Sequence, residues 1–448
     1  MTSQLALMNQ MAVALASDSA VTVGEKTYNS VQKIFTLDGN QQIGFMIAGT
    51  ATYIPCDVHW ERVIKLFSDE IGNTPFTTLS DCVEKFKNFV TNEPNLAPNS
   101  ENEIMIQADL IEFMEDLLKT KHKEQLDEVV RNVSGDLYEE YPGLDERISK
   151  SITDRIDHYH DLLKGYSDNL DEDSKHKHFR ILKRNKDAIN GAAEYFREKH
   201  GISSKDSKKT QFIMSYHLAE HSSLMSRTGR WRESTNLVIA GFGTEQLTPE
   251  LHELRVGSIV DEENGPFYDG DVHTIRARED LSDYGQTIHE GRDWSAGAFI
   301  IPYAQKDEIQ TILNGIHDDF INGYLLGPHP NYIGNAILNI LDNAILNIDG
   351  VGPATYSKIE DCFKECATEI RSKILSENQD AIDHYRMKRR GSFRRSTKSM
   401  SAQQLAEFAK KLVAMEAEIT YYSKPKRTVG GDILTATITK EHGFVFQR

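Results

Sequence analysis

The stretch that decides the fold is Thr2 to Ser19, TSQLALMNQMAVALASDS, near the start of the chain. Its two apolar runs, LALM and MAVALA, flank Asn9-Gln10, and Asn tolerates the backbone conformation that a tight turn requires. We therefore predict a β-hairpin in which the partner of residue i is about 19 − i. In that register Thr2 lies opposite Ser17, next to the carboxylate of Asp18.

Thr2 directly follows Met1, so removal of a single methionine would expose its α-amine. A hydroxyl and a free α-amine on one residue form a nucleophile with its own general base, because an α-amino group has a pKa of about 7.7 to 8.0. The alternative is that a small second residue merely permits removal of the methionine. Together with the residues described below, the hairpin favours a catalytic role for Thr2.

The composition is that of a globular protein with a large core and no disulfide framework. The chain has 448 residues, of which 39% are hydrophobic and 27% charged, and its four cysteines form no CxxC pair. No apolar run reaches the roughly 18 to 20 residues of a membrane helix. The first residues also lack the basic leader of a signal peptide. We therefore expect a cytoplasmic protein without a membrane segment.

The net charge of −17 argues against nucleic acid as a partner, because phosphate binding depends on cationic side chains. The basic stretch 386–398 is a local exception, and its Gly and Ser content predicts a flexible loop. This loop is either simply solvated or a contact for an acidic partner or a neighbouring subunit.

The order of hydrophobic periodicities predicts an α+β protein with helical insertions. Strand-like alternation fills the first 50 residues, whereas spacings of three and four residues from Trp60 onward indicate helices. Strands at both ends with helices between them suggest a split α+β sandwich. The core is expected in three pieces, 1–95, 233–320 and 401–448, with a helical insertion over 96–232 and a second one, which contains the basic loop, over 321–400.

The first strands resemble those of the proteasome β-subunit family, including its bacterial relatives, within the N-terminal-nucleophile hydrolases. Four residues match in order: Thr2, Asp18 in Ala-Ser-Asp-Ser 16 residues later, Lys33 in Val-Gln-Lys-Ile, and Gly49 in Met-Ile-Ala-Gly-Thr. The resemblance implies a Thr2 nucleophile, tuned by Lys33 with Asp18, and an oxyanion hole at the Gly49 N–H. A buried Lys also needs a partner, for which Asp18 is available. For Gly49 the alternative is a glycine that only ends a strand.

Later segments resemble the family with less detail. They are 238–242, like its central strand, 301–305, like the start of a helix, and 429–432, like its double-glycine turn. The family has a serine in the first of its two turns, where this chain has Ala304 and Gln305. It has an aspartate and a serine before the double glycine, where this chain offers the hydroxyl of Thr428. Ser19, Gln305 and Thr428 are therefore auxiliary candidates.

The resemblance implies a four-layer αββα sandwich and a homo-oligomeric ring or stack. We predict a threonine peptidase that cleaves polypeptides through Thr2 after removal of Met1. Two alternatives stay open, because a fold does not define its substrate. The chain could hydrolyse small amides with the same chemistry, or it could be an inactive ring-forming scaffold or regulatory subunit.

No metal or organic cofactor is expected. The chain has neither GxxxxGK[ST] nor a Rossmann glycine pattern, so any ATP-dependent unfoldase would be a separate protein. His217 and His221, like Cys362 and Cys366, are four residues apart on expected helices, as metal ligands can be, but neither pair belongs to a complete motif. We interpret both pairs as ordinary structural residues.

Overall fold

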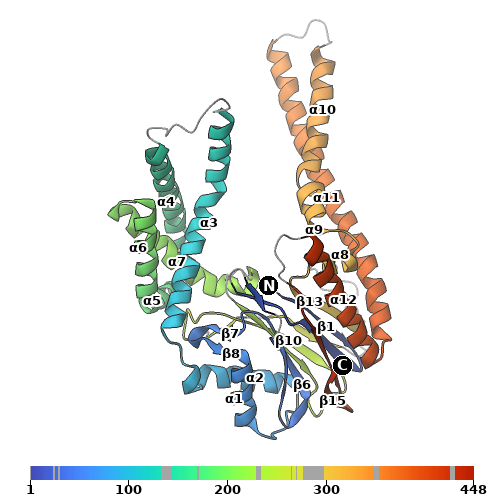
Figure 1. The fold of residues 1–448 in the computed structure, drawn as a ribbon. Helices are drawn as coiled ribbons and strands as arrows, with labels where there is room; N and C mark the ends of the chain where they lie inside the picture. Colours follow the sequence, from blue (N-terminus) through green and yellow to red (C-terminus); the bar gives the residue numbers. More distant parts are fainter. Residues whose placement is uncertain are drawn as a thin grey trace. The chain divides into compact units, whose positions relative to one another are not determined.

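The computed structural model is a mixed structure of helices and antiparallel sheets, which confirms the predicted α+β class (Figure 1). It describes residues 2–23, 26–28, 31–132, 144–168, 171–228, 234–263, 265–268, 270–275, 297–346, 353–423 and 429–447. The chain divides into two compact units. The first comprises Met1–Ile34, Gln246–Glu250 and His273–Arg448, and the second comprises Phe35–Glu245 and Leu251–Val272.

The first unit is built on a five-stranded sheet in the order β13-β1-β2-β14-β15. Its strands are β1 (Ser3–Asn9), β2 (Ala12–Asp18), β13 (Ala298–Ala304), β14 (Ile433–Thr439) and β15 (Gly443–Gln447), and a separate hairpin is formed by β3 (Val21–Val23) and β4 (Lys26–Tyr28). Its helices are α8 (Asp307–Asn314), α9 (Asp318–Phe320), α10 (Pro328–Leu346), α11 (Pro353–Lys398) and α12 (Ala402–Ser423). The sheet therefore brings the first strands of the chain beside the last ones.

The hairpin of β1 and β2 forms as predicted, but in a different register. Gln4 pairs with Ser17, so the partner of residue i is 21 − i, and the predicted 19 − i is wrong. The reason lies in the turn. Asn9 stays in β1, and its Oδ1 accepts the N–H groups of Met11 and Ala12 at 3.0 and 3.1 Å. Because the shift is two residues, the same side chains still share a face of the sheet.

Asn9 also ties this hairpin to the connection between α11 and α12. Its Nδ2 donates to the carbonyls of Thr397 at 3.0 Å and Met400 at 2.8 Å. We expect Asn9→Ala to lower the free energy of unfolding by about 2–3 kcal/mol, because buried backbone groups lose their partners. Denaturant unfolding measures this loss. The exposed neighbour Gln10 is the control, since Gln10→Ala should change stability by less than about 0.5 kcal/mol. Equal losses in both variants would contradict the role of Asn9.

One face of the first sheet is covered by α8 and α12. The alternating residues Leu5 and Leu7 of β1 point to this face, together with three alanines of β2. The small alanines let helix α12 approach the strands closely. This core cluster contains Leu5, Leu7, Ala12, Ala14, Ala16, Ile309, Leu313, Leu405, Ala406, Ala409, Leu412 and Val413. All residues of β1 and β2 are buried, on both faces of the sheet.

The second unit has a sheet in the order β11-β10-β9-β6-β5, with β12 beside β10. Its strands are β5 (Ile34–Leu37), β6 (Asn40–Gly49), β9 (Thr235–Gly241), β10 (Glu250–Val256), β11 (Phe267–Tyr268) and β12 (Val272–Thr274), and a short hairpin is formed by β7 (Thr52–Tyr53) and β8 (Val58–His59). Helices α1 (Trp60–Ile71) and α2 (Leu79–Asn92) cover one face of the sheet. The rings of Phe67 and Phe86 meet edge to face there, with centroids 5.1 Å apart.

Five more helices in this unit fall within the predicted helical insertion 96–232. They are α3 (Ser100–Asn132), α4 (Leu144–Asp168), α5 (Glu172–Arg184), α6 (Lys186–His200) and α7 (Ser204–Thr228). Leu110, Ile156 and Phe196 are fully buried in their shared core. His217 stacks on the ring of Phe113, with centroids 3.5 Å apart, so its ring is a packing element in this bundle.

The basic stretch 386–398 is helical, so the predicted flexible loop is wrong. It forms the end of α11, which packs along α10 and against α8. Its Arg386 forms an ion pair with Asp318, and Arg390 Nε donates to Asn314 Oδ1 at 2.6 Å. These contacts with neighbouring elements hold the stretch as a helix despite its Gly and Ser residues.

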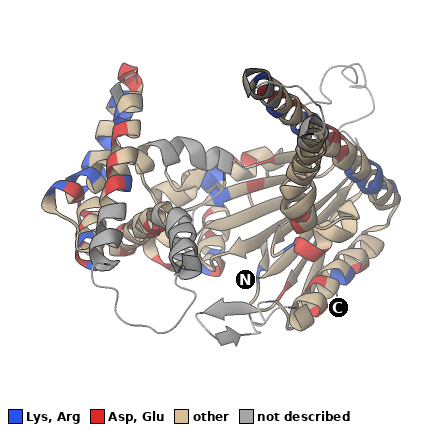
Figure 2. Cartoon of the chain, turned by 90° about the horizontal axis from the view of Figure 1, so that it is seen from above, with Lys and Arg blue, Asp and Glu red and all other residues tan. Residues whose placement is uncertain are grey.

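The charged residues of the described chain lie mainly on the helices, while most residues of the strands are uncharged (Figure 2). This distribution agrees with the burial of the strands. Among the described helices, none is both long enough and apolar enough to cross a membrane.

Candidate functional site

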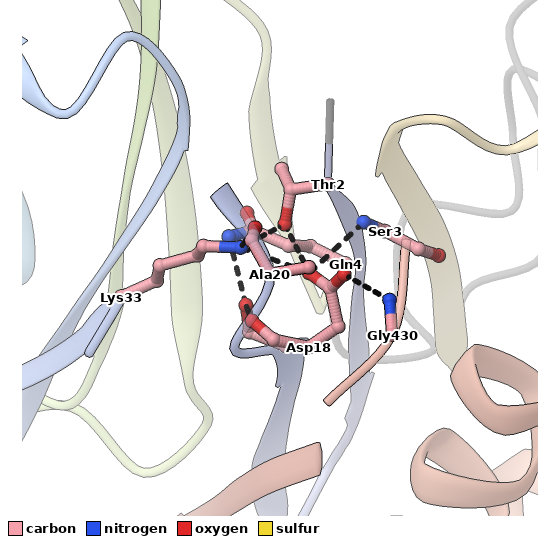
Figure 3. A network of polar contacts seen from close by, with 8 residues as sticks. Thr2, Ser3, Gln4, Asp18, Ala20, Lys33 and Gly430 are labelled. Carbon is pink, nitrogen blue, oxygen red and sulfur yellow. Dashed lines mark hydrogen bonds and ion pairs between the residues drawn. The ribbon is translucent and has the colours of Figure 1, made fainter. Parts of the chain in front are cut away.

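Three of the predicted residues meet at one end of the first sheet (Figure 3). The Thr2 hydroxyl donates to Asp18 Oδ1 and accepts a hydrogen bond from Lys33 Nζ. Lys33 Nζ and Asp18 Oδ1 are 2.9 Å apart, which confirms the predicted ion pair. All three are buried, with exposed fractions of 4% for Thr2, 1% for Asp18 and 6% for Lys33. A hydroxyl thus lies between a cation and a carboxylate in a buried site.

The Lys33 ammonium has a partner for each of its three protons. Besides Thr2 and Asp18, it donates to the carbonyl of Ala20 at 2.6 Å. Burial lowers the pKa of Lys33 below its ordinary value, and the charge of Asp18 opposes this shift only in part. When the ammonium is charged, it stabilises negative charge on the Thr2 oxygen, which lowers the free energy of the alkoxide.

The Asp18 carboxylate is held by four donors. Its Oδ1 accepts from the Thr2 hydroxyl, from Lys33 Nζ and from the Ser3 N–H at 3.2 Å. Its Oδ2 accepts from the Gly430 N–H at 2.9 Å. Hydrogen bonds to an ionised group are the strong ones, so this set fixes the carboxylate in position beneath Thr2.

The fold delivers these side chains from three segments. Asp18 is the last residue of β2, where the observed register places it opposite Ser3, the first residue of β1. The strand-like alternation of the first 50 residues predicts Lys33 within a strand, but Lys33 lies just before β5, which begins at Ile34. The N–H of Val31 donates to the carbonyl of Ser19 at 3.3 Å. This bond joins the two ends of the segment that contains β3 and β4, so the chain before Lys33 lies next to the end of β2.

The main chain of Thr2 is also fixed by a hydrogen bond. Its carbonyl accepts the N–H of Gln305 at 2.8 Å, at the point where β13 ends. The side chain of Gln305, an auxiliary candidate, instead donates from Nε2 to Thr420 Oγ1 at 3.0 Å. The backbone of Gln305, and not its amide side chain, is therefore the group that contacts Thr2.

Gly49 ends β6 in the second unit. Its φ is +97°, a conformation that L side chains rarely adopt, and a Cβ there would lie 2.3 Å from the carbonyl oxygen of Ser234. The same oxygen accepts the N–H of Thr50 at 3.2 Å. Local packing therefore suffices to explain a glycine here, and the oxyanion role of its N–H stays a prediction.

The other two auxiliary candidates are Ser19 and Thr428. Ser19 is half-buried directly after Asp18, and its carbonyl takes part in the Val31 bond described above. Thr428 lies outside the described residues. Both remain predictions as parts of the site.

Sequence reasoning missed the backbone donors around Thr2 and Asp18. The sequence signal for the Gly430 donor is the double glycine of the 429–432 turn, because consecutive glycines allow a backbone of positive φ. Gly430 and Gly431 have φ values of 145° and 74°, so both require glycine. This geometry aims the Gly430 N–H at Asp18.

A scan of the chain against models of known protein families found no match, and a search of curated proteins found none either.

Proposed function

We propose that this chain is an N-terminal threonine amide hydrolase, most simply a peptidase, related to the proteasome β-subunits that its first strands resemble. The observation that carries the proposal is the position of the Thr2 oxygen between Lys33 Nζ and Asp18 Oδ1. Buried ionisable groups around a hydroxyl are the arrangement that activates a nucleophile. A purely structural ion pair would not need the hydroxyl of the second residue.

The proposed reaction uses only this chain's own groups and water. After Met1 is removed, the α-amine of Thr2 takes the hydroxyl proton, and Oγ1 attacks the amide carbon. The tetrahedral oxyanion is stabilised by N–H donors, for which Gly49 is the candidate. The C–N bond breaks, the amine leaves with the proton, and water then hydrolyses the ester on Thr2. Lys33 keeps positive charge beside the oxygen throughout, while Asp18 holds Lys33.

The four-layer αββα sandwich belongs to the same proposal. It is supported by the two units taken separately, since the larger antiparallel sheet of each unit has helices over one face. A homo-oligomeric ring or stack, a cytoplasmic location, polypeptide substrates and a separate ATP-dependent unfoldase complete the proposal, by resemblance to the family.

Mass spectrometry of the purified, untagged protein tests the premise of the mechanism. We expect an intact mass lower by one methionine residue, and after treatment with a β-lactone probe we expect a single acyl adduct on Thr2. Both follow from a free α-amine beside an activated hydroxyl. Retention of Met1, or labelling of another residue with Thr2 unmodified, would contradict the proposal.

A further inference from the structure

Glu416 of α12 is a fully buried carboxylate near the start of α8. Its exposed fraction is 0%. Its Oε2 accepts the N–H groups of Glu308 and Ile309, both at 2.9 Å, whereas Oε1 has no hydrogen-bond partner among the described residues. A buried polar atom without a partner is rare and requires a reason.

The two N–H groups that Glu416 accepts belong to the first turn of α8. Such groups have no partner inside their own helix and are usually satisfied by a side chain just before it. Here that residue is Lys306, whose side chain makes no capping bond. The cap comes from α12 instead, so Glu416 couples the start of α8 to a second helix.

The same short segment also contacts Thr2. Ala304 ends β13 with a φ of +57°, a left-handed conformation that is unfavourable for a residue other than glycine. The next residue, Gln305, donates its N–H to the Thr2 carbonyl at 2.8 Å. Its side chain donates to Thr420, which lies one turn beyond Glu416 on α12. Helix α12 therefore holds the segment at both ends.

We propose that Glu416 is a positioning residue of the Thr2 site, which fixes the start of α8 and thereby the Gln305 N–H that holds the main chain of Thr2. This inference rests on the proposed function, because it assigns Glu416 a part in keeping the nucleophile in place. Burying a carboxylate is costly. Burial raises the pKa of Glu416, its two backbone N–H partners oppose this, and the carboxylates of Asp307 and Glu308 add to the rise. Because burial of the Glu416 carboxylate is unfavourable, we expect this group to have a role beyond filling space.

The test compares Glu416→Leu, Glu416→Gln and the exposed control Glu418→Leu on the same helix. Glu416→Leu removes the acceptor, so we expect kcat on a peptide substrate to fall about tenfold or more, with KM changed less than about twofold. Amide hydrogen exchange at Gln305 should accelerate in parallel. Glu416→Gln retains an oxygen that can accept both N–H groups, so it should restore most of kcat and of the protection. The control should match the unmodified protein.

Unchanged kcat and unchanged exchange at Gln305 in Glu416→Leu would overturn the inference, as would a loss in Glu416→Gln as large as in Glu416→Leu. If Glu416→Leu does not fold, Thr420→Val replaces it, since this variant removes only the acceptor of the Gln305 side chain. It should also lower kcat, and an unchanged kcat counts against the inference. If the unmodified protein hydrolyses nothing and no probe labels Thr2, the proposed function fails by itself. Exchange at Gln305 then still decides whether Glu416 holds this segment.

Discussion

Thr2→Ala should abolish amide hydrolysis, lowering kcat/KM by at least about 10⁴-fold, because the variant has no oxygen to form the acyl intermediate. The contacts of Thr2 indicate that this loss should come from removal of the hydroxyl and not from unfolding. The hydroxyl is the group that bridges Lys33 Nζ and Asp18 Oδ1, and the methyl of alanine can accept no hydrogen bond. Lys33 keeps its bonds to Asp18 and Ala20, so the fold itself should survive. Fluorogenic peptides of several side-chain classes measure the rate.

Thr2→Ser is the matched control for this variant. Serine keeps the hydroxyl and the α-amine, so a substantial part of the activity and of the labelling by a β-lactone probe should remain. Unfolding temperatures of all three proteins show whether the loss comes from chemistry. Activity in Thr2→Ala equal to that of the unmodified protein would remove Thr2 from the site, whatever its contacts.

Lys33→Met should be the most destabilising single change at the site. It leaves the Asp18 carboxylate buried without its counter-charge, and breaking a buried ion pair from one side costs about 3 kcal/mol or more. We also expect kcat to fall by about 10²–10³-fold, because the positive charge beside the Thr2 oxygen is gone. Denaturant unfolding and steady-state kinetics measure the two effects. Lys410→Met, which removes an exposed lysine from α12, should leave both nearly unchanged.

A double variant distinguishes the effect of breaking the ion pair from the effect of losing side-chain packing. Asp18→Asn combined with Lys33→Met leaves no unpaired charge, so the double variant should lose less stability than the sum of the single ones. Additive losses would mean that the two residues act independently. The kcat of the double variant should stay low, since neither charge is present near Thr2.

The stability of the unmodified protein should also depend on pH through Lys33. Its pKa in the folded protein is lowered below the ordinary value of 10.5. Between these two pKa values the unfolded chain binds a proton that the folded chain does not, so stability rises with pH across that alkaline window. Lys33→Met should lack this contribution. Unfolding temperatures that rise equally with pH in both proteins would contradict the burial of a titrating Lys33.

Much of the fold was predictable from local patterns. Alternation of apolar residues identified the hairpin, and spacings of three and four residues identified helices such as α1 and α2, because side-chain periodicity follows directly from backbone geometry. The register of the hairpin was not predictable in this way. It depends on whether Asn9 enters the turn or stays in β1, and its bonds to the carbonyls of Thr397 and Met400 involve residues almost 400 positions away.

The prediction of a flexible loop at 386–398 was wrong for a related reason. Gly and Ser lower helix propensity only modestly, and packing readily overrides such preferences. The contacts that keep this stretch helical, including those of Arg386 and Arg390, come from the segment around α8 and α9. Local composition carries no information about them.

The sequence by itself determined which side chains could perform chemistry: Thr2, Asp18 and Lys33 are of the right types and follow in an order that a strand hairpin brings together. Only the tertiary structure decided which backbone N–H groups form hydrogen bonds with them. The N–H groups of Ser3, Gly430 and Gln305 contact Asp18 and Thr2. Every residue except proline carries an N–H, so residue type does not distinguish a donor at the site from any other. The folded path of the chain selects it.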